Sequence, residues 1–151
     1  MIRVNALVIL SLCCAACGLV ACSAAKSIPP AAVTRYQLNT WEADIGYSQV
    51  VQVGDTFYIS GVACAGADYA EAVASCYHEL GEILARFGLG AENIVKENIY
   101  AADMEALKQQ IPARKAFYGT AYPAATWVQV ERLYSADHLL EIELIAVKAA
   151  R

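Results

Sequence analysis

The chain has 151 residues, of which 58% are hydrophobic and 17% are charged. This length is enough for one domain with a buried core and too short for two comfortable ones. The formal net charge is −4, and Arg3 is the only charged residue before Cys22, so the rest of the chain is slightly more acidic. An acidic domain without a basic run offers no electrostatic surface to a phosphate backbone, so we expect no nucleic-acid partner.

The first 21 residues are predicted to form a lipoprotein-type signal peptide. Arg3 supplies the positive charge, and the apolar run over 6–20 is shorter than the roughly 20 residues that a membrane-spanning helix needs. The run ends in the letters LVAC, which resemble the lipobox of bacterial lipoproteins and finish at Cys22. We therefore expect a protein of the cell envelope that faces the periplasm and is attached to the membrane through a lipid on Cys22. Ser23 after it favours the outer membrane.

Two other interpretations of this segment stay open, an ordinary cleaved signal peptide with incidental cysteines and a buried N-terminal helix. Cys17 is a second candidate for the lipid, but Cys14 stands where a lipobox has a branched apolar residue, so Cys22 fits better. Small residues and a Pro-Pro pair over 22–33 are typical of an extended tether. The folded domain is then expected over 34–151.

The predicted elements begin with a short strand over 36–39. Strands over 47–53 and 56–62 follow, and Gly54-Asp55 between them suits a hairpin turn. The clearest helix covers 70–87, because apolar residues recur there at helical spacing before Gly88.

The second half of the domain repeats the alternation of strands and helices. A strand is predicted over 94–101, and the helical pattern over 104–118 contains Pro112, so we expect a kink or two short pieces there. Strands over 125–133 and 139–147 close the chain. The order predicts an α+β fold, with a single sheet and both helices on one face.

Two cysteines remain in the domain after the predicted leader. Cys76 lies on the apolar stripe of the predicted helix, and Cys64 lies just past a strand. Buried free thiols are our first expectation, a disulfide is the second, and a catalytic or metal-binding role is the third. No CxxC motif or histidine cluster accompanies them, so we expect no metal and no cofactor.

Several short segments occur in an order that resembles a known family. They are YSQ at 47–49, VGDT at 53–56, ISG at 59–61, GL at 88–89, NIVK at 93–96, YPA at 122–124, EIE at 141–143 and IAV at 145–147. In this order, from about 47 to 148, the chain resembles the RidA/YjgF family of reactive-intermediate deaminases. The resemblance implies a chorismate-mutase-like fold, a single mixed sheet with two helices packed on one face, which assembles as a homotrimer with small-molecule pockets at the subunit interfaces.

Alternation along the last two strands agrees with such a sheet. A period of two predicts one aliphatic face for helix packing and one polar face with large side chains for a pocket or interface. We place Val128, Val130, Ile142 and Leu144 on the first face, and Trp127, Gln129, Glu141 and Glu143 on the second.

The resemblance also shows what this chain lacks. Active family members hydrolyse enamines and imines derived from amino acids. In them an arginine in a Pro-Ala-Arg motif binds the substrate carboxylate through two parallel N–H···O hydrogen bonds. Here Ala125 stands in place of that arginine, a loss of about 2–5 kcal/mol of binding. Trp127 adds aromatic bulk on the same face, and Ile111 replaces a helical asparagine of the family. The predicted ligand site is therefore more apolar.

Other family positions are retained. Glu141 matches the glutamate thought to position the hydrolytic water, although an interface hydrogen-bonding role stays open. Tyr47, Ser60 and Gly61 match residues that line the pocket, and Tyr47 would also serve as ordinary core. Ser60 has no base in sequence reach, so we do not expect it to act as a nucleophile.

Two arginines are candidates to replace the lost anchor. Arg114 depends on the kink at Pro112, whereas strand alternation points Arg132 away from Ala125. His78 and His138 are expected on the solvated surface.

Three functions are compatible with this pattern. The first is a lipid-anchored trimer that binds a small, mostly apolar or aromatic molecule without deaminase activity. The second is an imine or enamine hydrolase whose substrate lacks the usual carboxylate. The third is a structural envelope protein with a vestigial pocket.

Overall fold

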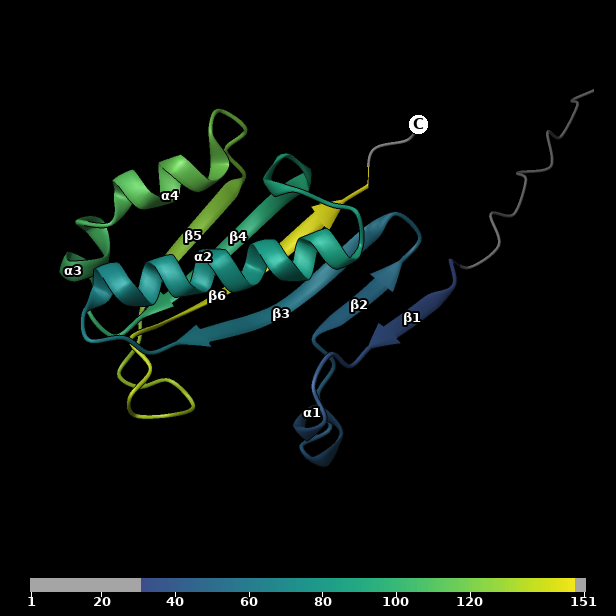
Figure 1. The fold of residues 1–151 in the computed structure, drawn as a ribbon, viewed down its shortest axis with the longest axis horizontal. Coiled ribbons are helices and arrows are strands. Elements are labelled where there is room, and N and C mark those ends of the chain that lie inside the picture. Colours follow the sequence, from purple (N-terminus) through teal and green to yellow (C-terminus); the bar gives the residue numbers. More distant parts are fainter. Residues whose placement is uncertain (1–30, 149–151) are drawn as a thin grey trace, which may run out of the picture.

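The computed structural model describes residues 31–148, which form one six-stranded sheet with helices across one face (Figure 1). The predicted signal peptide, Cys22 and most of the tether lie outside the described residues. The strands are β1 (Val33–Tyr36), β2 (Val50–Val53), β3 (Thr56–Cys64), β4 (Ile94–Ala101), β5 (Ala124–Gln129) and β6 (Leu140–Val147). The helices are α1 (Trp41–Asp44), α2 (Tyr69–Arg86), α3 (Met104–Lys108) and α4 (Ile111–Tyr118), with a 3₁₀ turn at Ala91–Asn93.

The sheet is mixed, with the strand order β1-β2-β3-β6-β4-β5. All neighbouring strands are antiparallel except β4 and β5, which are parallel and are joined through α3 and α4. A parallel pair needs such a crossover, because a tight turn can only return the chain antiparallel. The predicted fold class, a single mixed sheet with its main helices on one face, is confirmed.

The predicted hairpin is present, but the first strand lies earlier than expected. Gly54 has φ +59°, which a tight turn between β2 and β3 requires, and Val53 pairs with Thr56. β1 begins at Val33 rather than at residue 36, and it pairs with β2. Residues 38–49 instead form a turn around α1, which sequence reasoning did not predict.

Helix α2 follows the predicted apolar stripe closely. Asp68 caps its start by accepting a hydrogen bond from the Glu71 backbone N–H at 2.9 Å. Gly88, with φ +66°, lies just beyond its end. The buried face packs over β3 and β6 and contains Ala72, Val73, Cys76, Tyr77, Leu80, Ile83 and Leu84.

The predicted interruption of the second helical segment is also present. Asp103 accepts hydrogen bonds from the Glu105 and Ala106 backbone N–H groups of α3, and Pro112 lies in the first turn of α4. A proline costs nothing at that position, because the first turn has no internal acceptor for its N–H. Two short helices therefore replace one kinked helix.

The two faces of β5 are assigned the wrong way round relative to those of β6. Ala125 pairs with Glu97, and Trp127 pairs with Ile99, whose side chain is buried under the helices. Trp127 therefore lies on the helix-covered face of the sheet, as Ile142 does, and it packs against α4. Glu141 lies on the other face. The Gln129 side chain faces the same way and accepts a hydrogen bond from the first N–H of α3. Val128 consequently belongs to the open face, where it is 42% exposed.

The opposite face of the sheet bears no helix among the described residues (Figure 1). Exposed apolar side chains on it include Tyr58 and Val128. Cross-strand polar contacts accompany them: Asn98 Nδ2 donates to Glu143 Oε1 at 2.5 Å, and Lys96 Nζ donates to Thr126 Oγ1 at 2.6 Å. No helix in residues 31–148 is long and apolar enough to cross a membrane.

Cys64 and Cys76 form a disulfide between the end of β3 and helix α2, with their Cα atoms 5.7 Å apart. This corrects our first expectation of buried free thiols. The predicted strand and helix bring the two side chains onto the same layer of the core, where both residues are buried.

Candidate functional site

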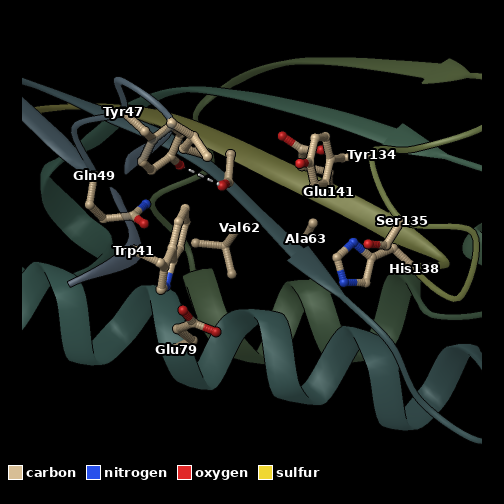
Figure 2. A pocket seen from close by; sticks show the side chains of 12 residues that line it. Trp41, Tyr47, Gln49, Val62, Ala63, Glu79, Tyr134, Ser135, His138 and Glu141 are labelled. Atoms are coloured by element: carbon tan, nitrogen blue, oxygen red, sulfur yellow. Dashed lines mark hydrogen bonds between the residues drawn. The ribbon is translucent and has the colours of Figure 1, made fainter. Parts of the chain in front are cut away.

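A cavity of about 510 Å³ opens beside β3, where that strand has no neighbour on one side (Figure 2). β2 pairs with β3 only as far as Ile59, with one further backbone bond from Ser60 N to Gln49 O. The next residues, Gly61 to Ala63, line the cavity. Helix α1, helix α2 and the loop between β5 and β6 supply the other walls.

The cavity brings together three of the residues predicted from the sequence. Tyr47, Gly61 and Glu141 all line it, and the Tyr47 hydroxyl donates to the Gly61 carbonyl at 3.0 Å. Ser60 does not belong to the lining set, because its hydroxyl is turned to the Ser48 carbonyl at 2.8 Å. Ser60 therefore supports the wall of the cavity and does not contact its interior.

Glu141 reaches from β6 across β3. A Cβ on Gly61 would overlap the Glu141 side chain, so a glycine is required at that point for the carboxylate to lie there. Burial raises the pKa of Glu141, the neighbouring Glu143 raises it further, and His138 acts in the opposite direction. Burial likewise raises the pKa of the Tyr47 phenol, which keeps it a neutral donor at physiological pH.

A buried carboxylate holds the aromatic wall of the cavity in place. Glu42 is fully buried and accepts hydrogen bonds from the backbone N–H groups of Leu38, Asn39 and Gln49 at 2.9–3.1 Å. These bonds close the turn that contains α1. They position Trp41 against Tyr47, with ring centroids 5.4 Å apart and an interplanar angle of 29°.

None of the nine other lining residues was predicted as a site residue, and four of these nine carry aromatic or ionisable side chains. Trp41 and Glu79 carry no local motif, and Tyr134 lies in an irregular loop with 81% of its surface exposed. His138 was expected on the solvated surface, but it lines the cavity, and its Nδ1 is buried without a hydrogen-bond partner. Only the fold assembles these residues, because they come from three separate segments.

Ala125 and Trp127, predicted to bind the ligand, lie elsewhere in the chain's own fold. Trp127 packs between β5 and α4 with Ile111 and Arg114, and the void left beside it is only about 10 Å³. Within one chain these residues do not share a cavity with Glu141. A role for them in a ligand site stays a prediction that requires a second copy of the chain.

Arg114 is part of a buried polar cluster centred on Glu97. The fully buried Glu97 carboxylate accepts from Arg114 Nε at 2.7 Å, Tyr118 Oη at 2.7 Å, Tyr77 Oη at 3.0 Å and Trp127 Nε1 at 3.4 Å. Burial, followed by the nearby Glu97 charge, raises the pKa of both tyrosines, so both remain protonated donors. Glu97 lies on the same buried face of β4 as the apolar Ile99 and Ala101, and no motif marks it in the sequence.

The arrangement combines aromatic walls with a small number of ionisable groups. Among the twelve lining residues there are two carboxylates, Glu79 and Glu141, one histidine and no lysine or arginine. Such a cavity can enclose an apolar ligand, and Glu141 can orient a water molecule or accept a proton. It has no guanidinium of its own to grip a carboxylate.

Comparison with known proteins agrees with this fold. A family model described as Endoribonuclease L-PSP matches residues 38–148. A 2-iminobutanoate/2-iminopropanoate deaminase of Mus musculus is 34% identical over 112 residues, which cover 68% of this chain and 81% of that protein. A RutC family protein of Pyrococcus abyssi is 27% identical over 110 residues, covering 68% of this chain and 86% of that protein.

Solved structures show the same architecture. A YjgF-family protein from Mycobacterium tuberculosis superposes with a TM-score of 0.72 at 23% identity, covering 78% of this chain and all of that one. A Rid-family protein from Yersinia pestis gives a TM-score of 0.69 at 24% identity, with coverage of 78% and 100%. Since the family model spans nearly the whole described domain and the mouse relative is 34% identical, the chain is a member of the RidA/YjgF family.

Proposed function

We propose that this protein is an exported, lipid-anchored member of its family that binds a small, mostly apolar or aromatic molecule without the standard deaminase activity. We also propose that it acts as a homotrimer. The uncovered sheet face, with its exposed Tyr58 and Val128, supports an interface between copies. The family resemblance implies that such an assembly places a pocket at each subunit interface.

The composition of the cavity is the observation that best supports binding without deamination. The substrates in the name of the mouse relative, 2-iminobutanoate and 2-iminopropanoate, both carry a carboxylate. Here the family's arginine position is Ala125, and Arg114 is engaged with Glu97 on the helix side of the sheet. Two acidic and no strongly basic lining residues also disfavour a phosphate-backbone substrate, whatever the name of the family model.

A second candidate function is hydrolysis of an imine or enamine that lacks the usual carboxylate. Glu141 faces the cavity, and its raised pKa suits a general base that operates nearer neutrality than an ordinary glutamate. In this reaction water would add to the imine carbon while Glu141 takes one of its protons, which gives a carbinolamine. Glu141 would then pass that proton to the nitrogen, and the C–N bond would break to release an amine and a carbonyl compound.

Turnover and binding assays separate the two functions. We expect the full-length chain to hydrolyse neither 2-aminoacrylate nor a neutral aryl imine without a carboxylate faster than buffer. Ligand-observed NMR should meanwhile detect binding of neutral 2-phenylethanol. Trp41→Ala should weaken that binding about tenfold, because it removes one aromatic wall. Turnover well above buffer that is lost in Glu141→Gln would favour the enzyme over the binding protein.

Export is supported by the predicted leader and by the disulfide. Disulfides persist in oxidising compartments and are rare in the cytosol, so the Cys64–Cys76 bond fits a domain outside the inner membrane. The lipid anchor on Cys22 provides attachment without a membrane-spanning helix.

Metabolic labelling tests the anchor directly. With a radioactive fatty acid supplied to cells, we expect the wild-type chain to take up label and Cys22→Ala to lose it entirely. Cys17→Ala is the matched control and should keep the label, because its cysteine is not the predicted acceptor. Equal labelling of the wild type and Cys22→Ala would refute the assignment.

A further inference from the structure

The charge and the aromatic surface of the cavity have a joint consequence for the ligand. Trp41 and Tyr47 form one wall, and Tyr134 stands across from them beside Glu141 (Figure 2). Aromatic ring faces carry a negative quadrupole potential, which attracts cations and repels anions. Three rings around one space therefore favour a positively charged group.

The ionisable side chains act in the same direction. Glu79 lies on α2 beneath Trp41, and Glu141 lies at the other end of the cavity (Figure 2). Neither carboxylate accepts a hydrogen bond from another residue within 31–148, although the Glu141 side chain is only partly exposed. A half-buried carboxylate without a protein donor is costly, and a bound ammonium group would supply the missing donors.

Arg132, which lies beside the Glu141 end of the cavity, does not belong to its lining. Arg132 lines a separate depression on the open face, which shares Tyr134 and Glu141 with the cavity. Its Nη2 donates to the Tyr134 carbonyl at 3.2 Å, so it is held on the loop backbone. His138 is the one basic residue among the twelve that line the cavity.

We infer that the ligand of this cavity is an organic cation, an alkyl- or arylammonium group on an apolar body. The aromatic rings enclose the cation, and Glu79 and Glu141 neutralise it. This inference rests on the proposed binding function and names its ligand class. The charge of such a ligand is opposite to that of a ligand bound through its carboxylate.

Three probes of one shape and different charge test the inference on the full-length chain. At pH 7.5, 2-phenylethylamine is a cation, 2-phenylethanol is neutral and 3-phenylpropanoate is an anion. By calorimetric titration we expect the ammonium to bind about tenfold more tightly than the alcohol, and the carboxylate to bind most weakly.

Charge-neutral variants identify the groups responsible. Glu141→Gln and Glu79→Gln should each weaken ammonium binding about three- to tenfold and change alcohol binding by less than about twofold. Glu82→Gln is the matched control, because Glu82 lies on the same helix as Glu79 but outside the cavity lining, and it should change neither affinity.

The outcomes separate this inference from the function on which it rests. Equal affinity for the ammonium and the alcohol would overturn the cation inference and leave small-molecule binding intact. Tightest binding of the carboxylate, lost in Arg132→Gln, would overturn it in favour of an anion site at that arginine. If no probe binds at millimolar concentration, the proposed binding function itself fails.

Discussion

Glu97→Ala is expected to lower the free energy of unfolding by about 3–5 kcal/mol, the typical cost of removing one partner from a buried ion pair. Glu97 is fully buried, and the Arg114 side chain is only 13% exposed. Without the carboxylate, the guanidinium loses its counter-charge, and the Tyr77 and Tyr118 hydroxyls lose their acceptor. Urea denaturation followed by circular dichroism measures the change.

Two further variants show whether the charge or the hydrogen bonds dominate. Glu97→Gln keeps an acceptor for the tyrosines, so it should cost less, about 1–3 kcal/mol. Glu92→Ala removes a carboxylate that is exposed in the adjacent 3₁₀ turn, and it should stay within about 0.5 kcal/mol of the wild type. A loss below about 1 kcal/mol for Glu97→Ala would mean that the cluster does not stabilise the fold.

Breaking the disulfide is expected to have the next largest effect. Cys64 and Cys76 are 12 residues apart, and a closed loop of this length contributes about 3 kcal/mol in the chain-entropy model. A reductant should therefore shift the urea midpoint of the wild-type protein to lower concentration. The Cys64→Ala/Cys76→Ala variant should start at that lower midpoint.

The same double variant is the control for reductant effects on the rest of the protein. It lacks the Cys64–Cys76 disulfide, so the midpoint of its folded domain should not move when reductant is added. A midpoint for the oxidised wild type that matches the reduced one would contradict a stabilising bridge. Alkylation located at Cys64 or Cys76 by peptide mass spectrometry, in the protein purified without reductant, would contradict the bridge itself.

Local sequence patterns were sufficient for much of the fold. The apolar stripe and Gly88 predicted α2 to within a residue or two, and Gly54 predicted the hairpin between β2 and β3. Pro112 predicted the division of the second helical segment into α3 and α4. These features depend on residues close together in the chain, because helix periodicity and turn geometry are local properties.

The errors arose where contacts that leave no periodic pattern in the sequence decide the conformation. The turn at α1 depends on Glu42, whose carboxylate accepts hydrogen bonds from backbone N–H groups that precede and follow it in the chain. No periodic sequence pattern predicts such a turn. The orientation of β5 depends on its pairing with β4, which places Ala125 beside Glu97 and Trp127 beside Ile99. Alternation within a strand separates its two faces, but it does not say which face meets the helices.

The cavity beside β3 shows the division between sequence and tertiary structure most clearly. The sequence by itself determined the family resemblance, the absence of the anchoring arginine at Ala125 and three residues of the site, Tyr47, Gly61 and Glu141. Only the tertiary structure decided that Trp41, Glu79, Tyr134 and His138 join them. The physical reason is that β2 begins only opposite Ile59, which leaves the following part of β3 without a neighbouring strand on that side. The space beside it is enclosed by segments far apart in the chain. The acidic and aromatic character of the cavity arises only when these segments come together in the fold.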